Sequence, residues 1–170
     1  MGYNQCIGCC PIKIADFYYF YWMDTTSKRI ITAAVAAVIF NERGEVLLQK
    51  RKDVGKWCIL SGHIEFGETV HDAIVREILE ETNAYSEIVR LIGVYSTPEY
   101  STYRYDSKHV QYVISYFEAK LLSPISAKLP NEETLELKYF KTDNLPKDMA
   151  QVNPNWLTDA LDRTTPVFVR

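Results

Sequence analysis

The sequence lacks an apolar run long enough to cross a membrane. A membrane-spanning helix needs about 18 or more successive apolar residues, whereas the most apolar stretch, residues 30–40, is of strand length and is interrupted by Thr32. The first residues also lack a basic region followed by an apolar core, so they do not resemble a secretory signal. We therefore expect a cytoplasmic location and no membrane partner.

A surplus of basic residues is also missing. The chain has 19 Lys and Arg against 22 Asp and Glu, a formal net charge of −3, and its basic residues do not cluster. Duplex nucleic acid is therefore an improbable partner, because phosphate contacts from a basic face supply most of that affinity. A phosphorylated small molecule stays compatible with the charge, since bound divalent ions can bridge carboxylates to phosphates.

Cysteine is scarce, and its spacing is incomplete for a zinc site. Cys6 and Cys9 have the two-residue spacing of half a site, but neither Cys10 nor the distant Cys58 supplies the other half. Reduced thiols of a cytoplasmic protein are the expected state, and bound metal or a redox role is the alternative. The roles of Cys6, Cys9 and Cys10 stay open.

Internal repeats, low-complexity segments and linkers are absent as well. At 170 residues the chain is expected to form a single domain, residues 1–170, that begins with an aromatic-rich segment, residues 1–29. The aromatics of residues 12–23 follow neither a helical nor a strand period, so the structure of this segment is undecided. They either pack in the core or form an exposed face for a second subunit, which would make a homodimer.

What is present alternates between strand-like and helix-like patterns. Strands are predicted at residues 30–40, 45–51, 57–60, 88–96, 110–122 and 135–140, with a short helix at 154–161. The first of these strands is expected to be buried on both faces, because it is apolar throughout. The clearest helix runs from Thr69, a good N-cap, to Asn83, which tolerates the left-handed conformation that ends a helix. Mixed strands around one central helix predict an α/β fold.

Three carboxylates share one face of that helix. Glu77, Glu80 and Glu81 are spaced i, i+3 and i+4, which brings them together. Like charges this close repel one another, and a divalent cation with hard oxygen preferences would remove the repulsion. Arg76 could pair with a neighbouring carboxylate and hold it in place. Taken alone, such a triplet is usually a solvated helix face.

The sequence ahead of the triplet changes this interpretation. Gly62 is followed by five residues and Glu68, then by seven residues and the run 76–81. This spacing resembles the Nudix box, G-x5-E-x7-R-E-U-x-E-E-x-G-U with U aliphatic, at every charged position. The chain departs from the pattern at Asn83 and Ala84, in place of the late Gly and the following aliphatic residue. It departs also at Leu60-Ser61-Gly62, where the family often has Pro-Gly-Gly.

The resemblance implies a fold and an activity. The expected fold is a Nudix-like α/β/α sandwich with a mixed central sheet and one catalytic helix. The implied reaction is hydrolysis of a pyrophosphate bond in a nucleoside diphosphate linked to another group. By the family pattern Glu77, Glu80 and Glu81 would hold Mg2+ or Mn2+, with the backbone carbonyl of Ser61 as a further ligand. Glu68 would orient the loop and Arg76.

The general base is not fixed by the pattern. It is either a glutamate of the box or a carboxylate from a later loop. Glu132 and Glu133 stand just before the last predicted strand, near where such a residue falls. They are either the base or an extra ligand, or a plain pair of exposed loop residues.

Substrate-binding residues are predicted outside the box. Residues 95–109 carry four tyrosines, among them Tyr103, beside the cationic Arg104. These types suit stacking on a base and contact with phosphate, and they equally suit a surface hairpin. Gln49, Arg51 and Lys52, at the end of a strand, could also meet phosphates.

Two other kinds of function compete with hydrolysis. A Nudix-fold module could bind and sense a nucleotide without cleaving it, although such a module has no need of a repulsive glutamate triplet. A structural or interaction domain is suggested only by the aromatic N-terminal segment. The substrate itself is not specified by any motif.

Overall fold

The computed structural model describes residues 27–125 and 133–170. The expectations for the aromatic N-terminal segment, for Cys6, Cys9 and Cys10, and for Glu132 lie outside these described residues. The predicted strands and helices lie inside them, and most appear within a few residues of their predicted bounds. The strand predicted at residues 57–60 is instead two short strands, 57–58 and 60–63, which belong to different sheets.

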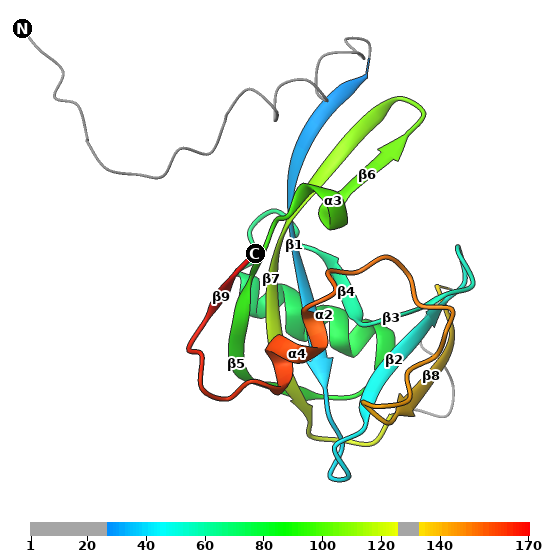
Figure 1. Ribbon diagram of the computed structural model, residues 1–170, viewed down its shortest axis with the longest axis vertical. Helices are drawn as coiled ribbons and strands as arrows, with labels where there is room; N and C mark the ends of the chain where they lie inside the picture. The colour runs from blue at the N-terminus through cyan, green and yellow to red at the C-terminus, as the bar shows by residue number, and fades with distance from the viewer. Residues whose placement is uncertain (1–26, 126–132) are drawn as a thin grey trace, which may run out of the picture.

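A mixed sheet forms the centre of the fold (Figure 1). Its order is β4 (Leu60–His63), β1 (Lys28–Ile39), β7 (Lys108–Leu121), β5 (Ser86–Tyr95) and β9 (Phe168–Val169), with β6 (Thr102–Tyr105) also paired to β7. β1 runs parallel to β7 and antiparallel to β4. The predicted mixed sheet is therefore confirmed.

A smaller antiparallel sheet stands beside the first. It has the order β3 (Trp57–Cys58), β2 (Val46–Arg51) and β8 (Thr134–Phe140). The connection from β1 to β2 is a tight turn in which the Asn41 side-chain oxygen accepts hydrogen bonds from the backbone N–H groups of Arg43 and Glu45. Gly44 completes the turn with φ of +74°, a conformation that favours glycine.

Helix α2 (Val70–Thr82) is the predicted central helix, and its ends are defined by local chemistry. The Thr69 hydroxyl accepts from the backbone N–H of Asp72, whose carboxylate in turn accepts from the backbone N–H of Thr69. This reciprocal capping box satisfies N–H groups that have no partner within the helix. At the other end Asn83 adopts the left-handed conformation, φ 52° and ψ 33°, that the sequence predicted for it.

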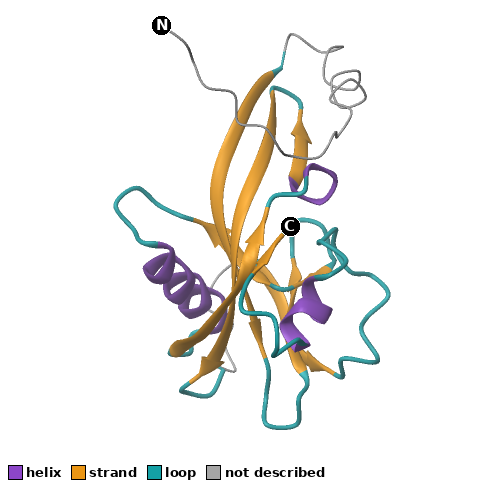
Figure 2. Ribbon diagram, turned by 60° about the vertical axis from the view of Figure 1, so that its left-hand side comes forward, coloured by secondary structure: helices purple, strands orange, loops and turns teal. Residues whose placement is uncertain are grey.

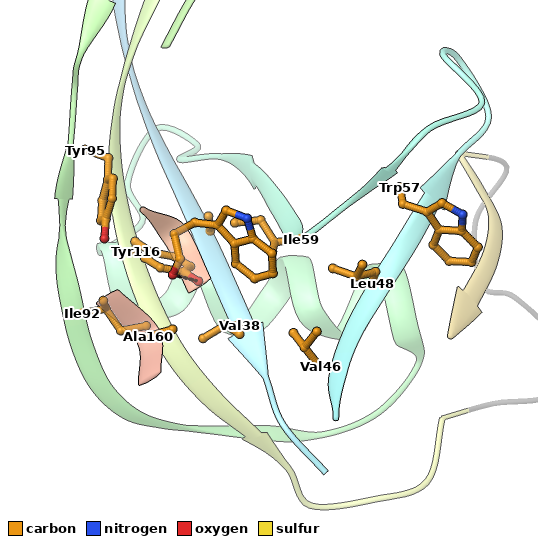
Figure 3. Close-up of a cluster of buried hydrophobic side chains, with 11 residues drawn as sticks. Val38, Val46, Leu48, Trp57, Ile59, Ile92, Tyr95, Tyr116 and Ala160 are labelled. Atoms are coloured by element: carbon orange, nitrogen blue, oxygen red, sulfur yellow. Dashed lines mark hydrogen bonds between the residues drawn. The ribbon is translucent and has the colours of Figure 1, made fainter. Parts of the chain in front are cut away.

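Helices cover both faces of the larger sheet (Figure 2). On one face α2 packs Ala73, Ile74 and Ile78 against a core that contains Val35 and Ala37 of β1. The short helices α3 (Pro98–Ser101) and α4 (Trp156–Leu161) complete the fold. α4 packs on the opposite face, where the aromatic and aliphatic side chains of a second core surround it (Figure 3). The arrangement is the expected α/β/α sandwich.

The first half of β1 differs from its prediction. Residues 34–39 are buried, as expected of a strand covered on both faces, but Ile31 is 74% exposed. Residues 28–33 instead leave the body of the molecule together with β6 and the start of β7, as Figure 1 shows. We call these three segments the arm. The apolar pattern alone could not show that the covering helices stop short of it.

No helix in the described part of the chain is long and apolar enough to span a membrane.

Candidate active site

A cleft of about 1320 Å³ opens beside the N-terminal end of the box. Its walls come from β4 and α2, from the end of β2 with the turn that follows it, from the hairpin of the arm, and from the segment that leads into α4. Among its lining residues are Arg51, Ser61, Gly62, Arg76, Glu77, Glu80, Glu81, Tyr103, Glu133 and Trp156.

The three glutamates reach this cleft at different depths. The Glu80 side chain is 54% exposed and that of Glu77 is 14% exposed, whereas Glu81 is 6% exposed as a whole residue. All three line the cleft. The helical spacing therefore brings the predicted residues together. Their exposure decreases from Glu80, which is near solvent, to Glu81, which is in the interior.

Arg76 joins the box into one unit. Its Nε and Nη2 donate to the two oxygens of Glu68 at 2.7 and 3.0 Å, and Nη2 also donates to the backbone carbonyl of His63 at 3.0 Å. Its Nη1 donates to Glu77 at 2.9 Å and to Glu80 at 3.3 Å. The hydrogen bonds from Arg76 hold the pKa of Glu68 below its usual value. Glu68 thus fixes the guanidinium that in turn holds the glutamates.

Glu77 lies against the backbone of Gly62. Desolvation by burial, reinforced by the nearby charge of Glu80, raises the pKa of Glu77, although hydrogen bonding from Arg76 acts in the opposite direction. Any side chain at position 62 would fall on this carboxylate. The glycine of the box is therefore required by the position of a glutamate 15 residues further along the chain.

Glu81 is the most unusual group of the cluster. Within the described residues its Oε2 is buried without a hydrogen-bond partner. Desolvation by burial, with the neighbouring charge of Glu77, raises the pKa of Glu81 well above its usual value. A buried carboxylate oxygen with no donor is costly, and a bound cation would remove that cost.

The donor set fits a divalent ion. Three carboxylates and the backbone of Ser61 are hard oxygen ligands of the kind that Mg2+ and Mn2+ prefer. As the described side chains lie, no three acidic, histidine or cysteine groups converge on one point, and Arg76 is bonded to both Glu77 and Glu80. A cation would therefore share these two carboxylates with Arg76.

Of the three residues predicted at the end of β2, only Arg51 is among the described residues that line the cleft. Its guanidinium forms two hydrogen bonds with Asp53, at 3.0 and 2.7 Å. Gln49 is 2% exposed and points into the interior, so it does not meet a phosphate there. Gln49 and Arg51 are two positions apart and would share a face in a regular strand, but the pairing register of β2 with β8 shifts between Lys50 and Arg51.

A row of aromatic rings extends from the box toward the arm. The rings of His63 and Tyr112 are 5.4 Å apart, and those of Tyr112 and Tyr103 are 5.6 Å apart. Tyr100 and Tyr105 also line the cleft, whereas Arg104 is exposed on β6 and is not among the described residues that line it. A hairpin with half-exposed tyrosines therefore forms one wall of the cleft, and its contact with a base or a phosphate stays a prediction.

Sequence reasoning missed the opposite wall, residues 150–156. This segment contributes Gln151 and Trp156 to the cleft. The Gln151 side chain donates to the backbone carbonyl of Glu99 at 2.6 Å, which ties the wall to α3. No local pattern marks these residues, because their place depends on contacts between distant parts of the chain.

Two buried ion clusters hold that wall in place. Asp159 accepts a hydrogen bond from the Tyr95 hydroxyl at 2.6 Å and two from the guanidinium of Arg170. Glu118 pairs with Arg90 and with Arg163. Burial opposes ionisation of both carboxyl groups, but their arginine partners keep the pKa of each below its usual value. The C-terminal segment is thus fastened to the larger sheet by charges that stay ionised.

Glu133 is exposed and lines the cleft, and its role as a base or an extra ligand stays a prediction. Its side chain adds to the negative potential at Glu81. Glu132 lies outside the described residues.

The glycine, the arginine and the three carboxylates of the box thus lie together around one cleft of an α/β/α sandwich. The NUDIX domain profile matches residues 31–160. The chain belongs to the Nudix hydrolase family.

Individual relatives and structures agree with this assignment. The chain is 31% identical over 128 residues, 75% of its length and 78% of the other, to a Bacillus subtilis protein named as a candidate 8-oxo-dGTP diphosphatase. It is 34% identical over 113 residues, 64% of its length and 62% of the other, to an ADP-ribose pyrophosphatase of Methanocaldococcus jannaschii. The crystal structure of an ADP-ribose pyrophosphatase from Streptococcus suis covers 82% of this chain and 98% of its own, with a TM-score of 0.63 and 22% identity.

These relatives bear on the kind of function. The chain is a Nudix pyrophosphohydrolase, an enzyme, and the sequence alternatives of a sensor module or a purely structural domain are not favoured.

Proposed function

We propose that the protein hydrolyses the pyrophosphate bond of a nucleoside diphosphate linked to another group, and that it requires Mg2+ or Mn2+ to do so. The observation that carries this proposal is Glu81, a buried carboxylate with a partnerless oxygen that lines the cleft beside Glu77. Such an oxygen is costly in an ordinary fold and useful in a cation site.

The site residues divide into roles. Glu77, Glu80 and Glu81, with the backbone carbonyl of Ser61, would hold the divalent ion. When bound, that ion neutralises the charge of the pyrophosphate and lowers the pKa of attacking water. Arg76 and Glu68 keep the glutamates in place through the hydrogen bonds described above.

The reaction needs a base for its water. A water oxygen forms a bond to phosphorus, its proton passes to a carboxylate, and the bridging P–O bond breaks to release a second phosphate product. Glu133, which lines the cleft, and the glutamates of the box are the carboxylates that we propose for this step. Replacing Glu133 by Gln separates them, because the loss of a base at this position would lower kcat strongly, whereas the loss of a carboxylate that takes no part in the reaction would not.

Recognition of the nucleoside falls to the aromatic wall. Tyr103 and Tyr112 offer ring faces and edges to a base, and Arg51 offers a guanidinium at the phosphate end. The names of the relatives show two substrate types, an oxidised deoxynucleotide and a nucleoside diphosphate linked to a sugar. A small nucleotide of one of these types is the substrate that we propose.

The experiment that tests the function is a substrate panel in the presence of Mg2+ or Mn2+. It should contain nucleoside triphosphates, oxidised nucleotides, nucleoside diphosphate sugars and dinucleoside polyphosphates, with products identified by mass spectrometry. Hydrolysis in 18O-labelled water shows which phosphorus is attacked, because only that product gains the label. Cleavage that continues in excess chelator, or no cleavage of any member, would overturn the proposal.

We also propose that the chain forms a single domain, with a homodimer as the open alternative to a monomer, and that it is located in the cytoplasm. Limited proteolysis, light scattering and cell fractionation test them in turn.

A further inference from the structure

Gln49 is buried next to the acidic cluster and is not among the described residues that line the cleft. It belongs to β2 and is 2% exposed. Its Nε2 donates to the Thr134 hydroxyl of β8 at 2.6 Å, and its Oε1 accepts from the Cys58 thiol of β3 at 3.8 Å. Hydrogen bonding from its side chain also acts to lower the pKa of Glu81 in α2, against the larger effect of burial.

These contacts occupy most of the hydrogen-bonding capacity of the side chain. A carboxamide carries two N–H donors and a carbonyl oxygen with two lone pairs. Nε2 donates to Thr134, hydrogen bonding from the side chain also acts on Glu81, and Oε1 accepts from the weak Cys58 donor. Turning the carboxamide over would exchange its donors and its acceptor, so these contacts favour one orientation.

Glu81 therefore has a hydrogen-bonding neighbour on one side only. Hydrogen bonding from Gln49 acts on its carboxylate, whereas Oε2 has no partner among the described residues. A buried Gln that follows the fully buried Leu47 and Leu48 in β2 has no need to be polar for packing. Its polarity is explained by the glutamate that it faces.

We propose that Gln49, anchored by Thr134, is a positioning residue that fixes the Glu81 carboxylate so that Oε2 is presented to the divalent ion. This inference rests on the proposed function, because it assigns Glu81 to that ion. Outer partners of this kind orient a ligand, and their loss typically lowers metal affinity by about 10–100-fold.

The test is a measurement of metal binding, separate from turnover. Gln49→Met keeps the length of the side chain and removes its hydrogen bonds, and Gln111→Met is the matched control. Gln111 donates to the backbone carbonyl of Ser96, away from the acidic cluster. Titration of Mn2+ followed by electron paramagnetic resonance should show affinity about 10–100-fold weaker for Gln49→Met, with Gln111→Met close to wild type. Circular dichroism establishes that both variants are folded.

Substitutions of Thr134 provide a second, independent test of the same proposal. Thr134→Val removes the hydroxyl at constant shape and should weaken Mn2+ binding, whereas Thr134→Ser keeps the hydroxyl and should restore it. Because Thr134 acts through Gln49, the double variant Gln49→Met/Thr134→Val should bind no more weakly than Gln49→Met alone. Additive losses in the double variant would contradict the anchored arrangement.

The outcomes separate this inference from the proposed function. If wild type and Glu81→Gln bind Mn2+ equally, the metal site fails, and the proposed function fails with it. If Glu81→Gln loses binding while a folded Gln49→Met binds within about two-fold of wild type, Gln49 is structural only and the positioning role is overturned, since a true outer partner changes affinity by more.

Discussion

The carboxylate of Glu77 occupies the space that a side chain at Gly62 would fill. A Cβ on Gly62 would lie 2.0 Å from the Glu77 carboxyl carbon and from its Oε1, closer than such atoms ever approach. Gly62 stands in β4, paired with Val35 of β1, and Glu77 stands in α2. The glycine at the start of the box thus sets how closely the helix can bring its glutamates to the sheet.

Gly62→Ala should therefore damage the site more than the fold. The added methyl group displaces Glu77, and a shift of about 1 Å in a catalytic group can cost about 100-fold in rate. The matched control is Gly93→Ala, whose Cβ would lie 2.5 Å from the Phe168 carbonyl oxygen in β9, away from the box. Turnover and Mn2+ affinity should fall only for Gly62→Ala, and thermal stability should fall more for Gly93→Ala. Equal kinetic losses in the two variants would show that Gly62 acts through the fold.

The buried carboxyl of Glu81 makes stability depend on pH in the metal-free protein. Its pKa is raised by burial and by Glu77, so the folded state keeps a proton that the unfolded state releases above the ordinary value of 4.5. The associated stability is fully present below pH 4.5 and is lost as the pH rises toward the folded-state pKa. In excess chelator, Glu81→Gln should therefore gain free energy of unfolding relative to wild type as the pH rises above the ordinary value of 4.5, measured by urea denaturation.

Adding Mg2+ should make the free energy of unfolding of the wild type larger than that of Glu81→Gln. A ligand that binds only the folded state raises its stability, and Glu81→Gln lacks the carboxylate that would hold it. A difference between the two proteins that stays constant with pH, and that Mg2+ leaves unchanged, would refute the assignment of Glu81.

Glu80→Gln separates catalysis from folding. Loss of a metal ligand or base should reduce turnover by about 10²–10⁴-fold or more. Stability without metal should hold or rise, because one member of a repulsive cluster is gone and its contact with Arg76 is exposed to solvent. Glu87→Gln is the control, since Glu87 is 53% exposed against 54% for Glu80 and pairs with Lys120 elsewhere. Near wild-type turnover in Glu80→Gln would remove this glutamate from the site.

Specificity should depend on Tyr103 and much less on its neighbour. Tyr103 lines the cleft and meets Tyr112, whereas Arg104 points away from it on the next position of the strand. Tyr103→Ala should raise KM for the best substrate by about 10-fold, since removing a ring that stacks on a base typically costs about 1–3 kcal/mol. Metal affinity should not change. Arg104→Ala should leave KM close to wild type, and the opposite ranking would move the recognition surface to the outer side of the hairpin.

The sequence predicted the helix and its carboxylates because both depend on local rules. Thr69 and Asn83 cap the helix through contacts within one turn, and the spacing of Glu77, Glu80 and Glu81 fixes their common face whatever surrounds them. Their different depths were not predictable, since burial of Glu81 depends on β2 and on Gln49.

The remaining walls of the cleft depend on distant contacts. Trp156 reaches the cleft because Asp159 is held by Tyr95 and Arg170, a pairing across 64 residues of chain in the case of Tyr95. The exposure of Ile31 has the same origin, because an apolar pattern indicates a strand without indicating where its neighbours end. Both features follow from tertiary packing and leave no local signature.

The parallel pairing of β1 with β7 has a consequence for how the enzyme is made. Lys28–Ile39 align with Lys108–Ala119, so every residue of the box is synthesised after one strand of this pair and before the other. Such a pairing closes a long loop and is slow to form compared with local structure. During synthesis the capped helix can form early, but the sheet against which it packs is incomplete until β7 has left the ribosome. The carboxylate cluster therefore matures late, and a nascent chain that ends before residue 108 should carry the whole box and yet have no activity.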